Sequence, residues 1–576
     1  MSLLREVNYL FDYKLKLKLV GMVFVILLGS IAELLGVAII LPIIELATDS
    51  ESITTNKYCQ FIMGITGETD ARQILLIFIV LTIGLYVVKN LYLSWMSYMM
   101  NRFSKNTRML FSVRLMESYM KQPYSYFLQK NTAEILRSVI NDTVNLYAVI
   151  ANTLQVISQG MTVFLIIVFL AFTNFVMTIV VAIVLGGATI LIVLTLQKKL
   201  RRMGVKFQRT SAGIVQSVKQ SFEGIKEVKI TNKERYFVDD FSSIFNKATK
   251  IELVYNLLSA IPKYVIETIC IGGIMAYLAI AIILGENMTE MLPQLSVFAM
   301  GAFKLLPSIN ALYASFSNIL YNKASIDLIY HDIREVEKIS DKCLKSNAIE
   351  TVKLKEKICV EQISFRYDNA DKDVLTKVSL EIRKGESVAF VGESGSGKTT
   401  LVDIILGILY PYEGEILVDG MNIVENLEGW HRGIGYIPQM IFLLDDTIRK
   451  NVAFGIPDEE IDDEAVWRAI RDAKLYEFVK ELELGLDTKV GEAGTRLSGG
   501  QRQRIGIARA LYYNPEILVF DEATSALDTE TEREVMEAIN GLHGMKTMLM
   551  IAHRLSTIEG CDHVYCVSGK NIEQIR

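Results

Sequence analysis

The chain has 576 residues, of which 51% are hydrophobic and 22% charged, and its formal net charge is −5 at pH 7. This length predicts several domains, and the slightly acidic balance argues against a nucleic-acid-binding protein held by an excess of Lys and Arg. Long apolar runs lie almost entirely before residue 325, whereas the chain from about 350 onward has ordinary charge density. We therefore predict a membrane half followed by a soluble α/β half.

The amino-terminal stretch LLREVNYLFDYKLKLK (3–18) places Leu3, Val7, Leu10 and Phe11 on one face of a helix. This pattern predicts an amphipathic helix lying on the membrane surface; a frayed terminus is the alternative. The apolar run that follows is longer than the core of a signal peptide and no small-x-small cleavage site follows it, so we expect a membrane span and not a cleaved signal.

Six stretches are long and apolar enough to cross a bilayer, which takes about 20 residues per helix. They cover about 19–46, 74–98, 147–172, 176–197, 262–284 and 292–315. The segments after the second and the fourth stretch are rich in Lys and Arg, which predicts that both are cytoplasmic. The acidic segment 48–72 then lies outside, and both termini lie in the cytoplasm.

Two cytoplasmic segments, 124–139 and 224–237, are the expected turning points of helices that continue well past the bilayer. Such tips are placed to contact the soluble half and to transmit force to it. Plain solvated loops are the alternative.

The first motif in the soluble half is VAFVGESGSGKTTLVDIILGIL (388–409), which predicts an apolar strand, a glycine loop and a helix. The loop fits G-x-x-x-x-G-K-[ST], in which backbone N–H groups and a helix N-terminus bind phosphate oxygens. We expect Lys398 to reach the β- and γ-phosphates and Thr399 to supply a hydroxyl to Mg²⁺. The expected nucleotide-binding residues of this first glycine loop are Gly392, Glu393, Ser394, Gly395, Ser396, Gly397, Lys398, Thr399 and Thr400.

A second strand, in EILVFDEATSALD (516–528), ends in two acids. Asp521 is placed to hold the Mg²⁺ shell, and Glu522 is placed to polarise the attacking water as a general base. Capping of the next helix is the alternative reading of such a pair.

Three further residues join this set. Tyr367, in ISFRYDN, is placed to stack on adenine, although an edge-strand tyrosine is the alternative. Gln439, in GYIPQ, is placed to bridge the γ-phosphate or the metal to the membrane half. His553, in IAHRLS, follows an apolar strand and is placed to contact the γ-phosphate, although a lone histidine is more often structural.

A second glycine loop begins LSGGQRQRIGIARAL (497–511), about a hundred residues after the first. Its Ser498, Gly499, Gly500 and Gln501 also precede a helix, which is again a phosphate-binding design. One nucleotide rarely needs two such loops from one chain.

The ordered set of Tyr367, GESGSGKT, Gln439, LSGGQ, ILVFDE, SALD and His553 resembles the nucleotide-binding domain of ABC transporters, and TKVGEAG (488–494) resembles a loop of their exporter branch. The resemblance covers essentially the whole chain. It implies a type I (also called type IV) exporter fold, in which an α-helical six-span transmembrane domain is fused to an α/β P-loop ABC domain. The implied parts are a transmembrane domain (1–325), a linker (326–350) and a nucleotide-binding domain (351–576), with a helical subdomain at about 445–486.

The resemblance also explains the second glycine loop, because in this family LSGGQ serves the ATP bound by a partner chain. It implies a homodimer that hydrolyses ATP with Mg²⁺ at two composite sites. ATP would close the dimer, and hydrolysis would open it.

Ionisable residues inside spans are functional candidates because they are costly there. Lys89, Lys263 and Lys304 are placed to line a cavity for an anionic headgroup, and Glu33 and Glu267 are acidic candidates. Snorkelling to an interface or pairing inside the protein is the alternative.

The strings NKY (56–58), AIPK (260–263) and KLLPSIN (304–310) resemble the bacterial flippases of lipid-linked oligosaccharides for protein N-glycosylation. Members of that family carry a short external helix, and here 55–66 has the amphipathic spacing of one. Ala311 stands where those flippases have a second basic residue. The resemblance implies flipping of a polyprenyl-pyrophosphate-linked oligosaccharide or a similar anionic glycolipid across a bacterial plasma membrane, with export of peptides, drugs or other lipids as the alternative.

Overall fold

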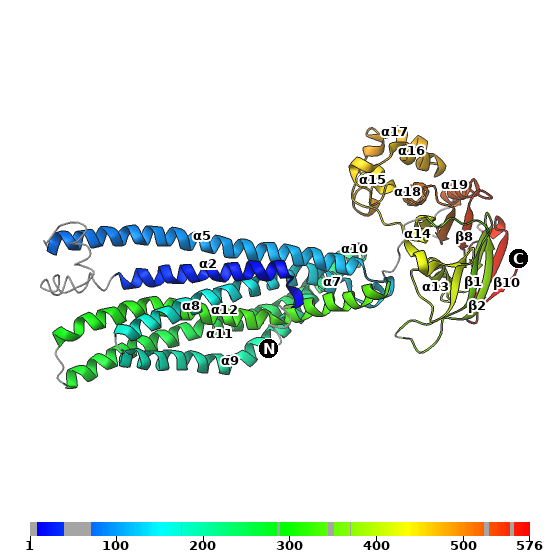
Figure 1. Ribbon diagram of the computed structural model, residues 1–576. Coiled ribbons are helices and arrows are strands. Elements are labelled where there is room, and N and C mark those ends of the chain that lie inside the picture. Colours follow the sequence, from blue (N-terminus) through cyan, green and yellow to red (C-terminus); the bar gives the residue numbers. More distant parts are fainter. Residues whose placement is uncertain are drawn as a thin grey trace. The chain divides into compact units, whose positions relative to one another are not determined.

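The computed structural model describes residues 9–39, 71–173, 175–284, 288–343, 351–368, 370–523, 529–552, 554 and 558–576. It divides into two compact units (Figure 1), and each is described by itself. The helical unit comprises Met1–Gln122 and Gln129–Ser340, and the α/β unit comprises Pro123–Leu128 and Asp341–Arg576.

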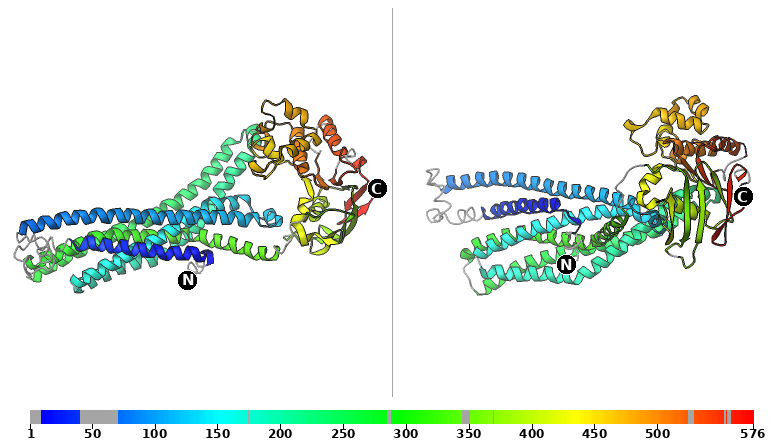
Figure 2. Two further views of the ribbon diagram at one scale, coloured as in Figure 1. Left: turned by 45° about the horizontal axis from the view of Figure 1, so that its top comes forward. Right: turned by 45° about the vertical axis from the view of Figure 1, so that its right-hand side comes forward.

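Long helices that lie side by side build the helical unit (Figure 2). They are α2 (Tyr13–Ala38), α5 (Ala71–Met120), α8 (Thr143–Thr173), α9 (Phe175–Glu223), α11 (Glu234–Leu284) and α12 (Met288–Cys343). Within the described part of the chain, five helical stretches are long and apolar enough to cross a membrane, and they lie in α2, α5, α8, α9 and α11. The predicted sixth span, 292–315, falls inside α12.

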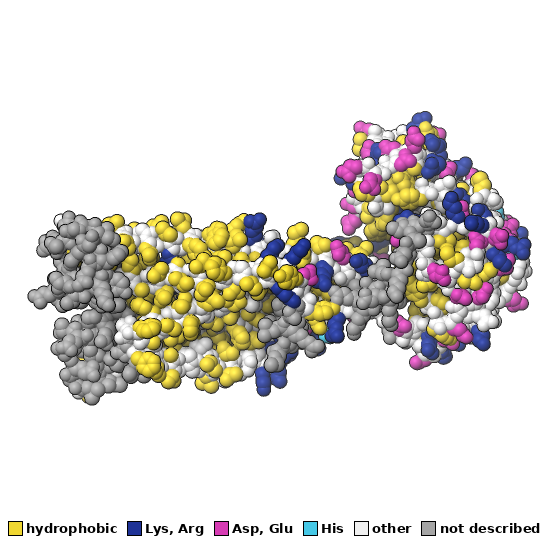
Figure 3. Space-filling view, in the orientation of Figure 1, with side chains coloured by type: hydrophobic (Ala, Val, Ile, Leu, Met, Phe, Trp, Pro, Cys, Tyr) yellow, Lys and Arg dark blue, Asp and Glu magenta, His cyan; other side chains and the backbone are white. Residues whose placement is uncertain are grey.

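The surface of the helical unit is mostly apolar over the length of these helices (Figure 3). Leu76, Val88, Phe164 and Ile190, for example, are more than half exposed. Such a surface is costly in water but suits lipid, where every backbone polar group is satisfied within its own helix. Lys and Arg gather toward one end of the helices in this view, as the predicted cytoplasmic segments require.

The helices run far beyond a bilayer. The 50 residues of α5 extend about 75 Å at about 1.5 Å per residue, against a hydrocarbon core of about 30 Å. Short helices occupy both predicted turning points and confirm them. They are α6 (Tyr124–Gln129), α7 (Thr132–Arg137), the π-helix Ser138–Asp142 and α10 (Ile225–Thr231).

The amino-terminal residues differ from the predicted surface helix where they are described. Leu10 and Phe11 are buried, at 1% and 4% exposed, and the Phe11 ring lies 6.0 Å from the ring of Phe111 on α5. Asp12 then caps α2 with extended backbone. Both apolar side chains are covered by protein, and Phe111 on α5 is the aromatic partner of Phe11. Leu3 and Val7 lie outside the described residues.

Helices α9 and α12 approach each other closely at Gly204. A Cβ atom added to this glycine would collide with the backbone carbonyl oxygen of Tyr321. No larger residue fits at this crossing without moving one of the helices.

The α/β unit contains two sheets. One is antiparallel, in the order β2–β1–β4–β5, and the other has the order β10–β9–β3–β8–β7–β6, in which the strands from β9 to β6 are parallel. The strands are β1 (Lys357–Phe365), β2 (Leu375–Arg383), β3 (Ser387–Val391), β4 (Glu413–Val418), β5 (Met421–Asn422), β6 (Ile434–Ile437), β7 (Ile517–Asp521), β8 (Thr547–Ile551), β9 (His563–Ser568) and β10 (Asn571–Gln574).

Helices surround the parallel sheet, and the predicted subdomain at 445–486 is helical. The α-helices are α13 (Lys398–Ile405), α14 (Leu427–Arg432), α15 (Ile448–Val452), α16 (Asp463–Asp472), α17 (Tyr476–Glu481), α18 (Gly499–Leu511) and α19 (Thr529–Asn540). Short 3₁₀ helices cover Ile423–Asn426, Asp458–Glu460, Gly485–Asp487 and Glu492–Gly494.

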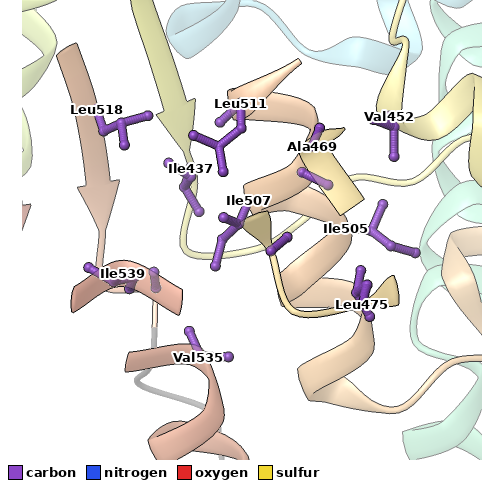
Figure 4. Packing of buried hydrophobic residues seen from close by; sticks show 14 of the residues in the cluster. Ile437, Val452, Ala469, Leu475, Ile505, Ile507, Leu511, Leu518, Val535 and Ile539 are labelled. Carbon is purple, nitrogen blue, oxygen red and sulfur yellow. The ribbon is translucent and has the colours of Figure 1, made fainter. Parts of the chain in front are cut away.

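The two faces of the parallel sheet carry different cores, because successive side chains of a strand point to opposite faces. On β7, Leu518 and Phe520 join one hydrophobic cluster, while Ile517 and Val519 join the other. The first cluster includes Ile505 and Ile507 of α18 (Figure 4), and the second includes residues of α13, such as Leu401 and Ile404. The helices that follow the two glycine loops therefore lie on opposite faces of one sheet.

Candidate functional site

The first glycine loop joins the buried strand β3 to α13. Gly392, Gly395 and Gly397 all have positive φ, at 146°, 81° and 105°, a region that side-chain-bearing residues rarely adopt. A Cβ atom on Gly392 would collide with the carbonyl oxygen of Val567, and one on Gly397 would lie 3.0 Å from a methyl group of Val374. Glycine is thus required for the tight cradle at the start of the helix.

Two polar groups line this cradle. The Lys398 side chain is 5% exposed, and its Nζ donates to the carbonyl oxygens of Gly392 and Glu393 at 2.8 and 2.9 Å. Its ammonium therefore lies within the loop, where a phosphate would attract it. The buried Oγ of Ser396 has no hydrogen-bond partner among the described residues. An unsatisfied buried hydroxyl inside a cradle of backbone N–H groups fits a phosphate ligand.

The acidic pair lies at the carboxyl end of β7, which lies between β8 and β6 in the sheet. Burial and the neighbouring Glu522 carboxylate raise the pKa of Asp521, although Tyr436 and Lys398 oppose the shift. Glu522 has φ 47°, in the left-handed region, which costs about 1–3 kcal/mol for such a residue. Gln439 Nε2 donates to Glu522 Oε2 at 2.7 Å, so these two predicted residues do come together.

Asp403 and Tyr436 were not among the residues predicted for this site. Burial and Asp521 raise the pKa of Asp403 to about 6, and the Tyr436 hydroxyl donates to Asp521 Oδ2 at 3.4 Å. Asp403 follows Thr399 by four residues on α13, so both lie on one helix face. This four-residue spacing from Thr399 is the sequence feature that could have placed Asp403 in the site.

Tyr367 lies beside the first turn of α13. Its hydroxyl is 3.0 Å from Thr400 Oγ1, and its ring packs edge-on against Phe365 at 5.0 Å. The predicted tyrosine is therefore next to the phosphate loop. His553 lies outside the described residues.

The second glycine loop starts α18 with a capping box. Ser498 Oγ accepts from the backbone N–H of Gln501, whose side chain accepts in turn from the backbone N–H of Ser498. Ser498 and Gly499 are exposed, while Gly500 is buried. The loop is thus a preformed helix N-terminus with its first residues open to solvent.

Arg509, near the end of α18, is a positioning residue that sequence reasoning missed. Its guanidinium donates to the carbonyl oxygens of Asn451 and Phe442, each at 2.8 Å, and lies 4.4 Å from the ring centre of Phe454. Burial lowers its pKa to about 10. Arg509 therefore links α18 by hydrogen bonds to the segment that follows Gln439. The sequence feature that could have identified Arg509 is a single basic residue within the apolar run IGIARALYY.

The residues present fit a Mg²⁺ ion that binds together with a nucleotide. No cluster of three or more His, Cys, Asp or Glu with metal-ligand geometry occurs among the described residues. Mg²⁺ does not need one, because it binds one or two protein oxygens together with phosphates and water. The exposed Thr399 hydroxyl and the Asp521 carboxylate would supply such oxygens.

The three candidate lysines of the helical unit differ in their surroundings. Lys89 and Lys304 both pair with Glu33 Oε2, at 3.6 and 2.6 Å, so the alternative of internal pairing holds for these two. Lys263 is exposed, and its ammonium lies 5.9 Å from the ring centre of Tyr264. The exposed Glu267 lies four residues further along α11.

Family models match both units. Residues 19–307 match the ABC transporter transmembrane region, and residues 375–525 match the ABC transporter domain. The structure of a bacterial Atm1-family ABC exporter with ATP bound is similar in fold, with a TM-score of 0.76 at 22% identity over 98% of this chain and 96% of that one.

Curated relatives carry the name ATP-dependent lipid A-core flippase. The protein of Cupriavidus metallidurans is 30% identical over 86% of this chain and 83% of its own length. The proteins of Syntrophus aciditrophicus and Francisella tularensis are 32% and 31% identical, over 80% and 88% of this chain and 76% and 83% of their own lengths. With both family regions present in one chain, the protein belongs to the ABC transporters and is a multi-pass membrane exporter with the type IV fold, whose fused ABC ATPase is coupled to transport.

Proposed function

We propose that this exporter flips a polyprenyl-pyrophosphate-linked oligosaccharide, or a similar anionic glycolipid, from the cytoplasmic to the outer side of a bacterial plasma membrane. The observation that carries the proposal is the pair Lys89 and Lys304, which share one carboxylate and leave a net positive charge in the helical unit. Charge inside a membrane protein is costly and is usually retained for a ligand or an ion. A phosphate group is a ligand that such a charge would attract.

An apolar cavity that begins one residue after Lys304 on α12 supports a lipid substrate. A cavity of about 200 Å³ lies between α8, α9 and α12, and its lining includes Leu305, which follows Lys304 directly. Leu170, Leu185 and Ile309 are further lining residues, and Thr178 and Thr189 are the polar ones. A lipid chain suits these walls, because burying apolar surface against them is favourable. The relatives named lipid A-core flippases make a lipid substrate the first choice.

The ATP chemistry is proposed to use two copies of the chain. Because α13 and α18 lie on opposite faces of one sheet, the two glycine loops of one chain are poorly placed for a single phosphate. The exposed Ser498 and Gly499 are free to approach the ATP held by a partner's first glycine loop. In this scheme Glu522 accepts a proton from the attacking water and Gln439 orients that water. Thr399 and Asp521 would hold a Mg²⁺ ion, which would supply positive charge next to the phosphates.

Flipping of a pyrophosphate-linked oligosaccharide by the purified protein in lipid vesicles tests the substrate. We expect ATP-dependent movement of this lipid, and loss of movement with retained ATPase activity in Lys304→Ala. A variant with an altered external segment 55–66, which lies outside the described residues, is expected to behave in the same way. Stimulation of ATPase by a peptide or a drug, with no movement of any polyprenyl lipid, would instead assign the protein to the other exporters.

A further inference from the structure

Three charged side chains from three helices meet inside the helical unit. Glu33 lies on α2, Lys89 on α5 and Lys304 on α12, and both lysines approach the same carboxylate oxygen. We call these residues the charge triad, and its formal charge is +1. Helix α2 packs against α5 and α8, and Leu34, next to Glu33, packs against a cluster that includes Leu305, next to Lys304.

The two lysines are held differently. Lys89 is 9% exposed, its ammonium lies 4.1 Å from the ring centre of Tyr86, and its chain packs against Gly36 of α2. Tyr86 is itself fixed, since its hydroxyl donates to the Gly36 carbonyl oxygen at 2.9 Å. The Lys304 side chain is 32% exposed. Lys89 is therefore the buried anchor of Glu33, and Lys304 is the member that a ligand can reach.

Glu33 holds Lys304 with poor geometry. Its Oε2 atom is buried and makes no hydrogen bond of normal geometry to any described residue, although it lies only 2.6 Å from Lys304 Nζ. The contact is thus a charge pair without a well-directed N–H···O bond. An incoming anion with several oxygens would offer the Lys304 ammonium better hydrogen bonds than this one shared atom does.

We propose that Glu33 is a built-in counter-ion, which the phosphate of an anionic lipid replaces at Lys304. This inference rests on the proposed function and assigns the substrate's phosphate a position. An unpaired ammonium in a poorly solvated site is costly, and the exchange keeps Lys304 paired both before and after binding. Glu33 stays beside Lys89 and repels the bound phosphate, so it lowers affinity and favours release.

The test measures binding of farnesyl pyrophosphate, a short polyprenyl pyrophosphate, to the purified full-length protein in discs of zwitterionic lipid by titration calorimetry. We expect Glu33→Gln to bind it about tenfold more tightly than the unchanged protein, because the repelling charge is gone. Lys304→Ala is expected to bind it at least about tenfold more weakly. The matched control is Glu223→Gln, an exposed acid on α9, and its affinity should equal that of the unchanged protein.

A second variant separates charge from folding. Glu33→Asp keeps the carboxylate and is expected to bind farnesyl pyrophosphate within about twofold of the unchanged protein. Should Glu33→Gln fold poorly, tighter binding by Glu33→Ala, measured on protein that retains ATPase activity, would support the counter-ion in the same way. Equal or weaker binding by both neutral variants overturns it.

Three other ligands identify the source of the anion. Farnesol, which lacks the pyrophosphate, should show no difference between Glu33→Gln and the unchanged protein. Inorganic pyrophosphate and discs containing phosphatidylglycerol show whether a free anion or a bulk lipid suffices. If farnesyl pyrophosphate binds and needs Lys304 but is indifferent to Glu33, the counter-ion alone is refuted. If neither the unchanged protein nor Glu33→Gln binds it, both this inference and the proposed substrate are refuted.

Discussion

The charged groups of the two units are positioned in different ways. In the α/β unit, Lys398, Asp521 and Glu522 follow directly from glycine turns or strand ends, so a few consecutive residues determine where each group lies. In the helical unit, the charge triad draws one residue from each of three helices, and Glu33 and Lys304 are 271 positions apart in sequence. Chemistry built on a local motif can be predicted without tertiary structure, whereas chemistry assembled from helix faces cannot.

The largest expected effect tests the local motif. Glu522→Gln keeps the size of the side chain and its contact with Gln439 but removes the proposed base, so ATPase activity should fall by roughly 10²–10⁴-fold while ATP binding persists. Measured turnover and nucleotide binding check this, with the exposed Glu425→Gln as the control. Normal ATP turnover by Glu522→Gln would show that Glu522 is not the general base, although it directly follows β7.

An intermediate effect is expected for Arg509, whose contacts in the α/β unit join residues that are distant in sequence. Arg509→Met keeps an unbranched side chain but leaves the Asn451 and Phe442 carbonyl oxygens without this donor, which should cost about 2–4 kcal/mol and reduce ATPase activity through the segment after Gln439. Thermal unfolding measures the loss of stability, and ATPase assays measure the loss of activity.

The control for Arg509 is Arg533→Met on α19, where the 75%-exposed arginine pairs only at 3.8 Å with Glu537. Its stability should change by less than about 0.5 kcal/mol. Equal stability and equal ATPase activity of the two variants would show that Arg509 does not position the segment after Gln439.

The smallest effect concerns Asp403. Its pKa of about 6 in the folded protein exceeds the unfolded value of about 3.9, so the folded state binds the extra proton. Stability should therefore fall as pH rises from about 4 to about 6 and remain lower above that range. Asp403→Asn removes this loss.

We expect Asp403→Asn to be about 1 kcal/mol more stable than the unchanged protein at pH 7.5, after allowing for partial exposure. The advantage should vanish near pH 4. Unfolding curves without nucleotide and with a chelator measure the difference. A stability advantage independent of pH would show that the carboxyl group does not titrate in this range.

Sequence predicted the long helices, the turning points at 124–139 and 224–237, and the alternating strands and helices, because each depends on local periodicity or composition. The pairing of Lys89 and Lys304 with one glutamate was not predicted, since it depends on the rotation of three helices about their axes. The burial of Leu10 and Phe11 was not predicted either. The amphipathic pattern of one stretch does not reveal whether lipid or another helix covers its apolar face. Asp403 and Arg509 act through residues that are distant in sequence, which are Asp521 at the end of β7 for Asp403 and Asn451 of α15 for Arg509.

The crossing at Gly204 has a mechanical consequence. The α9 backbone meets the Tyr321 carbonyl oxygen of α12 with no side chain between them, so turning α9 about its axis would bring a neighbouring side chain into that contact. We therefore expect the two helices to resist rotation about their axes at this crossing and to move together there. A displacement applied near this crossing would then reach the far ends of the two helices as a tilt and not as a twist.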